Sequence, residues 1–230
     1  RHDGVVVLVE DALPGQLVRA QVAAVRKSLA EAALVEVLER SPDEQEPPCP
    51  HAGRCGGCSW QSLAYGRQLA WKERIVHDAL ERVGKVACPP MLPILPSPSE
   101  WGYRNKMEFA FGVSGDGGKT LGLRERGSRN IVEVTGYLLQ TPLTMRVLEA
   151  VRMLSNGAFH DLDGRFLVVR EPNAGGCFVE LIVGAGGSLE AGERFAEALR
   201  AETPEVTGFA LSERLAPSDV AYGERALYAD

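Results

Sequence analysis

The pattern of hydrophobic and polar positions divides the chain into a short stretch of strands and a longer region of mixed strands and helices. Val5–Val9 is a β-branched run, and residues 18–22 alternate apolar with polar side chains, as a half-buried strand does. Residues 32–40 fit either a strand or a helix by pattern alone. We favour a strand because the segment follows other strands. The polar, proline-rich residues 41–48 then indicate a connector between domains.

The second region opens with a helix followed by an irregular segment. Apolar side chains recur at helical spacing from Gln61 to Val83, and Gly84 is a natural stop. Five prolines in positions 89 to 98 then predict extended, irregular chain. This proline-rich segment also holds Cys88.

From Trp101 onward the pattern predicts consecutive antiparallel strands, glycine-rich turns at 114–119 and 183–188, and two helices. The strands expected there cover residues 103–113, 120–127, 129–134, 164–171, 176–184 and 206–213, and the helices cover Leu143–Leu154 and Leu189–Arg200. This order of elements predicts an α+β fold in which the helices lie on one face of the sheet.

Composition narrows the class of protein. The 230 residues are 45% hydrophobic and 24% charged, which is typical of a soluble globular chain of one or two domains. No apolar run approaches the roughly 18–20 residues of a membrane helix, and no signal peptide is recognisable at Arg1. We therefore expect a cytoplasmic monomer with no membrane partner. The chain lacks an initiator Met, so we expect it to be part of a longer gene product.

Net charge and cysteine content add one constraint each. The formal net charge is −6, so any surface for nucleic acid has to be a local basic patch on an acidic body. There are five cysteines, and three of them fall within residues 49–58. Such clustering favours metal binding in a reducing compartment over a disulfide framework.

The cysteine cluster has the spacing Cys49-x5-Cys55-x2-Cys58. Two thiolates separated by two residues can reach one metal or cluster, and Gly56-Gly57 between them allows close approach of the backbone. A zinc site completed by His51 or a distant cysteine is one alternative, although no second Cys-x2-Cys pair is present. Packing of the three cysteines as small apolar residues is another, which the proline, glycine and arginine neighbours disfavour.

The segment CPHAGRCGGCSWQSLAYGRQLAWKERIV resembles the iron–sulfur segment of the RNA 5-methyluridine (uracil-C5) methyltransferases. DGVVVLVEDALPGQLVRAQV is similar to the latter half of a TRAM domain, a small β-barrel that binds RNA. WGYRNKMEFAF and LGLRERGSRNIVEV resemble the central domain, and FLVVREPNAGGCFVELIV resembles the strand pair that precedes the catalytic domain. The resemblance implies a partial OB-like β-barrel (TRAM) at residues 1–42, then a central domain of antiparallel sheet plus helices with an iron–sulfur loop at residues 43–230.

The resemblance also implies a [4Fe–4S] cluster held by Cys49, Cys55, Cys58 and a later cysteine. Where the family has that fourth cysteine, just after the strand NIVEV, this sequence has Tyr137. Cys88 is the better substitute because its segment is irregular, whereas Cys177 lies in a predicted strand and is interpreted as core. The other outcomes are a cluster with three cysteine ligands, a labile cluster, or none.

The S-adenosylmethionine domain of the family, with its catalytic residues, would follow Asp230. We therefore expect no catalytic residue in this chain, no binding of S-adenosylmethionine by it, and no methylation by it alone.

Basic residues on neighbouring predicted strands and turns form a candidate RNA-binding patch. Phosphates would meet the cations, and an unstacked base would lie on an aromatic ring. The patch comprises Tyr103, Arg104, Lys106, Arg124, Arg126 and Arg129, beside Trp101. The plain alternative is that these cations only keep the surface soluble and pair with Glu108, Glu125 or Glu133.

The sequence thus predicts the RNA-binding, cluster-bearing part of an S-adenosylmethionine-dependent RNA (uracil-C5) methyltransferase, with ribosomal RNA favoured over transfer RNA. The alternative is a stand-alone RNA-binding module with a structural zinc or iron–sulfur site and no catalysis. A small electron-transfer protein is disfavoured because only one incomplete cysteine set is present.

Overall fold

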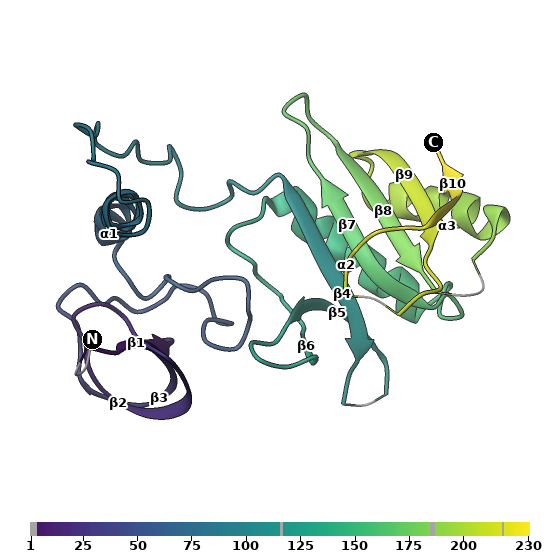
Figure 1. The fold of residues 1–230 in the computed structure, drawn as a ribbon. Coiled ribbons are helices and arrows are strands. Elements are labelled where there is room, and N and C mark those ends of the chain that lie inside the picture. The colour runs from purple at the N-terminus through teal and green to yellow at the C-terminus, as the bar shows by residue number, and fades with distance from the viewer. Residues whose placement is uncertain (1–3, 116, 185–186, 218) are drawn as a thin grey trace. The chain divides into compact units, whose positions relative to one another are not determined.

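The fold in Figure 1 is a computed structural model that describes residues 4–115, 117–184, 187–217 and 219–230. The chain forms two compact units. One comprises Arg1–Gly53 and Cys58–Pro98, and the other comprises Arg54–Gly57 and Ser99–Asp230. The predicted domain boundary at residues 42/43 stays a prediction. Of the predicted glycine-rich turns, residues 116, 185 and 186 lie outside the described residues.

The first unit contains an open three-stranded sheet in the order β1-β3-β2. Its strands are β1 Val6–Glu10, β2 Leu17–Arg26 and β3 Leu29–Glu39. Strands β2 and β3 are antiparallel with three register shifts, whereas β1 and β3 are parallel. The interpretation of residues 32–40 as a strand is confirmed. The strands described in this unit do not close into a barrel, so the TRAM domain stays a prediction.

A helix follows in the same unit, and it begins later than the hydrophobic pattern predicted. Helix α1 covers Tyr65–Asp78 and continues as a π-helical segment, Ala79–Val83, up to Gly84. The four residues from Gln61 onward are not helical, because Leu63 pairs with Glu44 in an isolated bridge. The side-chain amide of Gln68 also donates to the Leu63 carbonyl at 2.9 Å, which holds this turn. Residues 89–98 contain neither helix nor strand, as their prolines predict.

The second unit is built on a seven-stranded sheet in the order β10-β9-β8-β7-β4-β5-β6. The strands are β4 Lys106–Val113, β5 Lys119–Arg124, β6 Ile131–Val132, β7 Gly164–Arg170, β8 Cys177–Val183, β9 Val206–Glu213 and β10 Arg225–Ala229. The strands predicted within residues 103–134 are antiparallel neighbours, as expected, but the sheet as a whole is mixed, because β8 and β9 run parallel. The helix between them supplies the long crossover that parallel neighbours need.

Two helices lie on one face of this sheet, as predicted (Figure 1). Helix α2, Pro142–Asn156, packs on β5 and β7, and α3, Leu189–Glu202, packs on β9, β10 and α2. Each helix begins at a hydroxyl cap: the Thr144 amide donates to Thr141 Oγ1 at 3.2 Å, and the Ala191 amide donates to Ser188 Oγ at 3.1 Å. The core between the helices and the sheet includes Phe195 stacked on Phe209, with their ring centroids 5.5 Å apart.

The opposite side of the sheet, here called the helix-free face, carries the candidate patch residues Lys106 and Arg124. Phe209 packs on α3 and therefore faces the helices. Its cross-strand partners on β8 and β7 lead to Met107 on β4, so Met107 faces the same side. Glu108 is the next residue along β4 and therefore points away from the helices. Four buried side chains form a small cluster on this face: Ala110, Phe166, Val168 and Ile182. Ala221, from the connection between β9 and β10, packs against that cluster.

Candidate functional site

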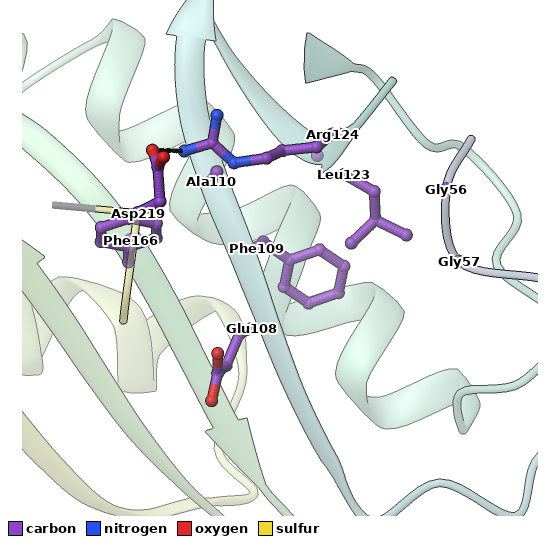
Figure 2. A pocket seen from close by; sticks show the side chains of 10 residues that line it. Gly56, Gly57, Glu108, Phe109, Ala110, Leu123, Arg124, Phe166 and Asp219 are labelled. Atoms are coloured by element: carbon purple, nitrogen blue, oxygen red, sulfur yellow. Dashed lines mark hydrogen bonds and ion pairs between the residues drawn. The ribbon is translucent and has the colours of Figure 1, made fainter. Parts of the chain in front are cut away.

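A pocket opens where β4 and β5 stop pairing (Figure 2). Their register runs from Val113↔Lys119 to Ala110↔Gly122 and ends there. Beyond that point β4 pairs only with β7, and the end of β5 pairs with β6. The pocket has a volume of about 290 Å³ and is lined by Gly56, Gly57, Glu108, Phe109, Ala110, Gly122, Leu123, Arg124, Phe166 and Asp219.

Gly122 is required at the point where the two strands part. A Cβ atom there would lie 2.0 Å from the carbonyl oxygen of Val132, so only glycine lets β6 approach β5 so closely. The strand therefore exchanges β4 for β6 as its partner at this residue. The side of the pocket formed by Gly122 is bare backbone as a result.

Residues 54–57 lie along the end of β5. The Gly56 amide donates to the Arg124 carbonyl at 3.1 Å, and the Arg126 amide donates to the Arg54 carbonyl at 2.8 Å. Cys55 pairs with Glu125 in an isolated antiparallel bridge. Part of the cysteine segment thus acts as a short edge strand of the second unit. Its Cys55 is buried, and the Sγ atom accepts from the Gly57 amide at 3.3 Å.

Tyr137 is buried beside this edge strand. A Cβ atom on Gly57 would lie 2.6 Å from the Tyr137 hydroxyl, so residue 57 has to be glycine while the tyrosine is there. The hydroxyl accepts from Arg104 Nη1 at 3.0 Å, and the guanidinium lies 5.9 Å from the ring centroid. Arg104 is thus a positioning residue for Tyr137, in addition to its predicted place in the RNA patch.

The predicted iron–sulfur ligands Cys49, Cys55 and Cys58 are divided between the two units. Cys49 and Cys58 belong to the first unit and Cys55 belongs to the second. Across the described residues, no three His, Cys, Asp or Glu side chains come together as a metal site. The position that the resemblance gives to a fourth cysteine holds the Tyr137 phenol, which is bonded to a cation. The [4Fe–4S] cluster with Cys49, Cys55 and Cys58 as ligands stays a prediction.

The two remaining cysteines differ in environment. Cys177 on β8 is fully buried, and burial raises the pKa of its thiol to about 11, with further contributions from Glu171 and Glu205. The interpretation of Cys177 as a core residue is therefore confirmed. Cys88 is half-buried in the first unit.

The predicted basic patch is partly brought together. Lys106 and Arg124 lie on the helix-free face, and Arg124 lines the pocket. Lys106 Nζ lies 2.6 Å from Glu108 Oε1, an ion pair that the sequence offered as the plain alternative. Arg124 Nη2 lies 2.7 Å from Asp219 Oδ1, a partner that the sequence did not suggest. Both pairs are exposed, so each contributes little to stability.

Of the other patch residues, Arg126 and Arg129 lie in the turn after β5, and Tyr103 and Arg104 precede β4. Tyr103 is 55% exposed, and Arg129 is exposed in the turn. Hydrogen bonds from Asn130 and Ser128 to the Glu125 carboxylate close that turn and lower the pKa of Glu125. Arg126 is held there by its backbone bond to Arg54. Their role in binding RNA stays a prediction.

Among the described residues, no helix combines the length and apolar character needed to cross a membrane.

The chain is similar to proteins named RNA methyltransferases. One from Nitratidesulfovibrio vulgaris is 45% identical over 240 residues, which cover 100% of this chain and 51% of that protein. One from Nostoc is 30% identical over 95% of this chain and 49% of its own length. A Xanthomonas oryzae protein named 23S rRNA (uracil(1939)-C(5))-methyltransferase RlmD is 42% identical over 57% of this chain and 30% of its own length. No protein-family model matches the chain. The chain thus spans about half, or less, of the length of these curated relatives.

Proposed function

We propose that this chain is the RNA-binding part of an S-adenosylmethionine-dependent RNA (uracil-C5) methyltransferase that acts on ribosomal RNA, as a monomer in the cytoplasm. The observation that carries the proposal is the similarity to an RNA methyltransferase along the whole chain. The choice of uracil C5 and of ribosomal RNA follows the printed name of the Xanthomonas relative.

The chemistry of such an enzyme explains why a separate RNA-binding part is useful. A base inside a duplex cannot be reached by a catalytic group, so the target has to be taken out of its stack. The surrounding nucleotides then need a surface that holds phosphates and unstacked bases. The helix-free face offers Lys106 and Arg124 for this purpose. S-adenosylmethionine supplies the methyl group when bound, and the proposal assigns no residue of this chain to it or to catalysis.

The test uses the longest natural protein that contains this sequence, together with unmodified 23S ribosomal RNA transcripts and labelled S-adenosylmethionine. We expect label in 5-methyluridine after digestion to nucleosides, and none when residues 1–230 alone replace the longer protein. Label in the ribose or in another base would overturn the uracil-C5 assignment. RNA binding with no methylation by any longer product would favour the stand-alone module instead.

A further inference from the structure

The pocket between β4 and β5 has the size and lining of a small recognition site. Resting on the proposed function, we propose that it is a subsite for one unstacked guanosine nucleotide of the RNA. Figure 2 shows Glu108 and Arg124 at two ends of the lining, with Phe109 between them. The two polar groups come from different strands, and each could contact a different part of one nucleotide.

The size and the lining of the pocket suit a single nucleoside. Its volume of about 290 Å³ is at the lower end of the range for small-molecule sites, which suits a single nucleoside better than a larger cofactor. Ala110 and Phe166 provide an apolar floor on the helix-free face. Gly56, Gly57 and Gly122 contribute no side chains, so a base can approach the backbone closely.

The Glu108 carboxylate selects among the bases. An ionised carboxylate only accepts hydrogen bonds, and it can accept two in parallel. Lys106 Nζ is paired with Oε1, and no side chain among the described residues bonds to Oε2. Guanine presents two adjacent N–H donors, N1–H and N2–H, on its Watson–Crick edge. Uracil presents one N–H between two carbonyl oxygens, which a carboxylate repels. The carboxylate therefore favours guanine.

Arg124 suits the phosphate of the same nucleotide. Its guanidinium has five N–H donors in a planar fork that matches phosphate oxygens. The side chain is 37% exposed, and its ion pair with Asp219, which is 67% exposed, is of the weak surface kind. A phosphate can therefore compete with the Asp219 carboxylate for the guanidinium. When no RNA is bound, the Asp219 carboxylate pairs with the Arg124 guanidinium in place of the phosphate.

The first experiment measures fluorescence anisotropy of the 230-residue chain with three labelled single-stranded heptamers. All are polyuridine except for a central guanosine, inosine or adenosine. Inosine keeps N1–H but lacks the 2-amino group. We expect the guanosine heptamer to bind about tenfold more tightly than the inosine heptamer, the discrimination expected of one good bidentate contact. Equal binding of all three would overturn the proposal.

Four variants locate the effect. Glu108→Gln should abolish the preference for guanosine over inosine, whereas the matched Glu190→Gln, an exposed carboxylate on α3, should keep it. Arg124→Met should weaken binding of all heptamers alike and lower the salt slope by about one. The matched control Arg146→Met removes another exposed, ion-paired arginine and should change neither. Unfolding midpoints equal to wild type show that each variant folds. A guanosine preference that survives Glu108→Gln would overturn the subsite.

A second measurement separates this proposal from the proposed function. Calorimetric titration with guanosine 5′-monophosphate and inosine 5′-monophosphate tests the pocket without RNA. Binding of the guanosine nucleotide that is lost in Glu108→Gln, with no binding of any heptamer, would support the pocket as a free-nucleotide site and overturn the RNA function. Heptamer binding that ignores Glu108, with no binding of either nucleotide, would overturn the subsite and leave the RNA function standing.

Discussion

Arg104 donates a hydrogen bond from Nη1 to the hydroxyl of Tyr137 at 3.0 Å, across a sequence separation of 33 residues. The tyrosine is 3% exposed, and its hydroxyl is close enough to Gly57 to exclude any side chain there. One cation thus holds the phenol, and the phenol packs against the short edge strand of residues 54–57. The contact lies wholly within the second unit.

Removing the hydroxyl should therefore weaken the second unit. Tyr137→Phe keeps the ring but leaves Arg104 without this acceptor, so we expect the free energy of unfolding to fall by about 1 kcal/mol. Urea denaturation followed by circular dichroism measures the change. Tyr222→Phe is the control, because Tyr222 is 63% exposed. Equal stability losses in both variants would contradict the assigned role of the hydroxyl.

The same tyrosine leads to a prediction about iron. With a phenol in place of the fourth cysteine, we expect anaerobically prepared protein to contain far less than one [4Fe–4S] cluster per chain. Tyr137→Cys should raise iron and acid-labile sulfide together and give the protein a brown colour, whereas Tyr222→Cys should not. Elemental and sulfide analysis checks both variants. Wild-type protein with a full complement of iron and sulfide would confirm the cluster that the sequence resemblance implies and contradict this expectation.

Cys177 should resist alkylation in the native protein. Its thiol is fully buried and has a pKa raised to about 11, so almost no thiolate is present at pH 8. Cys88, which is half-buried in an irregular segment, should react with iodoacetamide much faster. Peptide mass spectrometry after timed labelling gives both rates. Labelling of Cys177 should rise to the rate of Cys88 only in denaturant, and a fast native rate would place the thiol outside the core.

Asp230 should make part of the stability pH-dependent. Arg200 holds the pKa of this carboxyl well below its usual range through two hydrogen bonds of 2.7 and 2.6 Å, with further bonds from Tyr228 and the Phe209 amide. A carboxyl with a lowered pKa in the folded state contributes stability above its unfolded pKa, near 4, and this contribution is lost as pH falls further.

For that reason Asp230→Asn should lower the unfolding free energy at pH 7, by about 1 kcal/mol or less because the pair is one-third exposed. The difference from wild type should shrink steadily between pH 4 and 2, as shown by urea titrations at each pH. Asp161→Asn, at an exposed aspartate, is the matched control. A difference that stays constant with pH would show that the carboxylate charge is irrelevant to stability.

The local pattern of hydrophobic and polar residues predicted most helices and strands of the second unit. The errors concern features that depend on pairing between strands far apart in the sequence. Strand β9 covers the predicted residues 206–213, since a buried apolar run between turn residues leaves little choice. Strand β10 was missed because a five-residue edge strand carries almost no periodic signal. The parallel pairing of β8 with β9 was missed because direction depends on where the intervening helix returns the chain.

The candidate site shows the same limit. Tyr137 attracts attention in the sequence as a departure from the resembling family, yet its partner Arg104 was interpreted only as a contact for RNA. Asp219 was missed altogether, since it is 95 residues from Arg124 and comes from a connection with no motif. The pocket itself results from strand register at Ala110↔Gly122, which no local pattern encodes. Charge and residue type identify the candidate cations in the sequence, but only the fold shows which carboxylates pair with them.

The division of the chain into two units has a consequence for how the gene can be cut. The chain passes from one unit to the other after Gly53, returns after Gly57, and leaves again after Pro98. No single break in the coding sequence therefore separates the units intact. A fragment that starts at Ser99 loses the four residues that line the end of β5, including two of the three glycines that line the pocket, Gly56 and Gly57. Recombination that transfers a working second unit has to carry the first unit's helix with it.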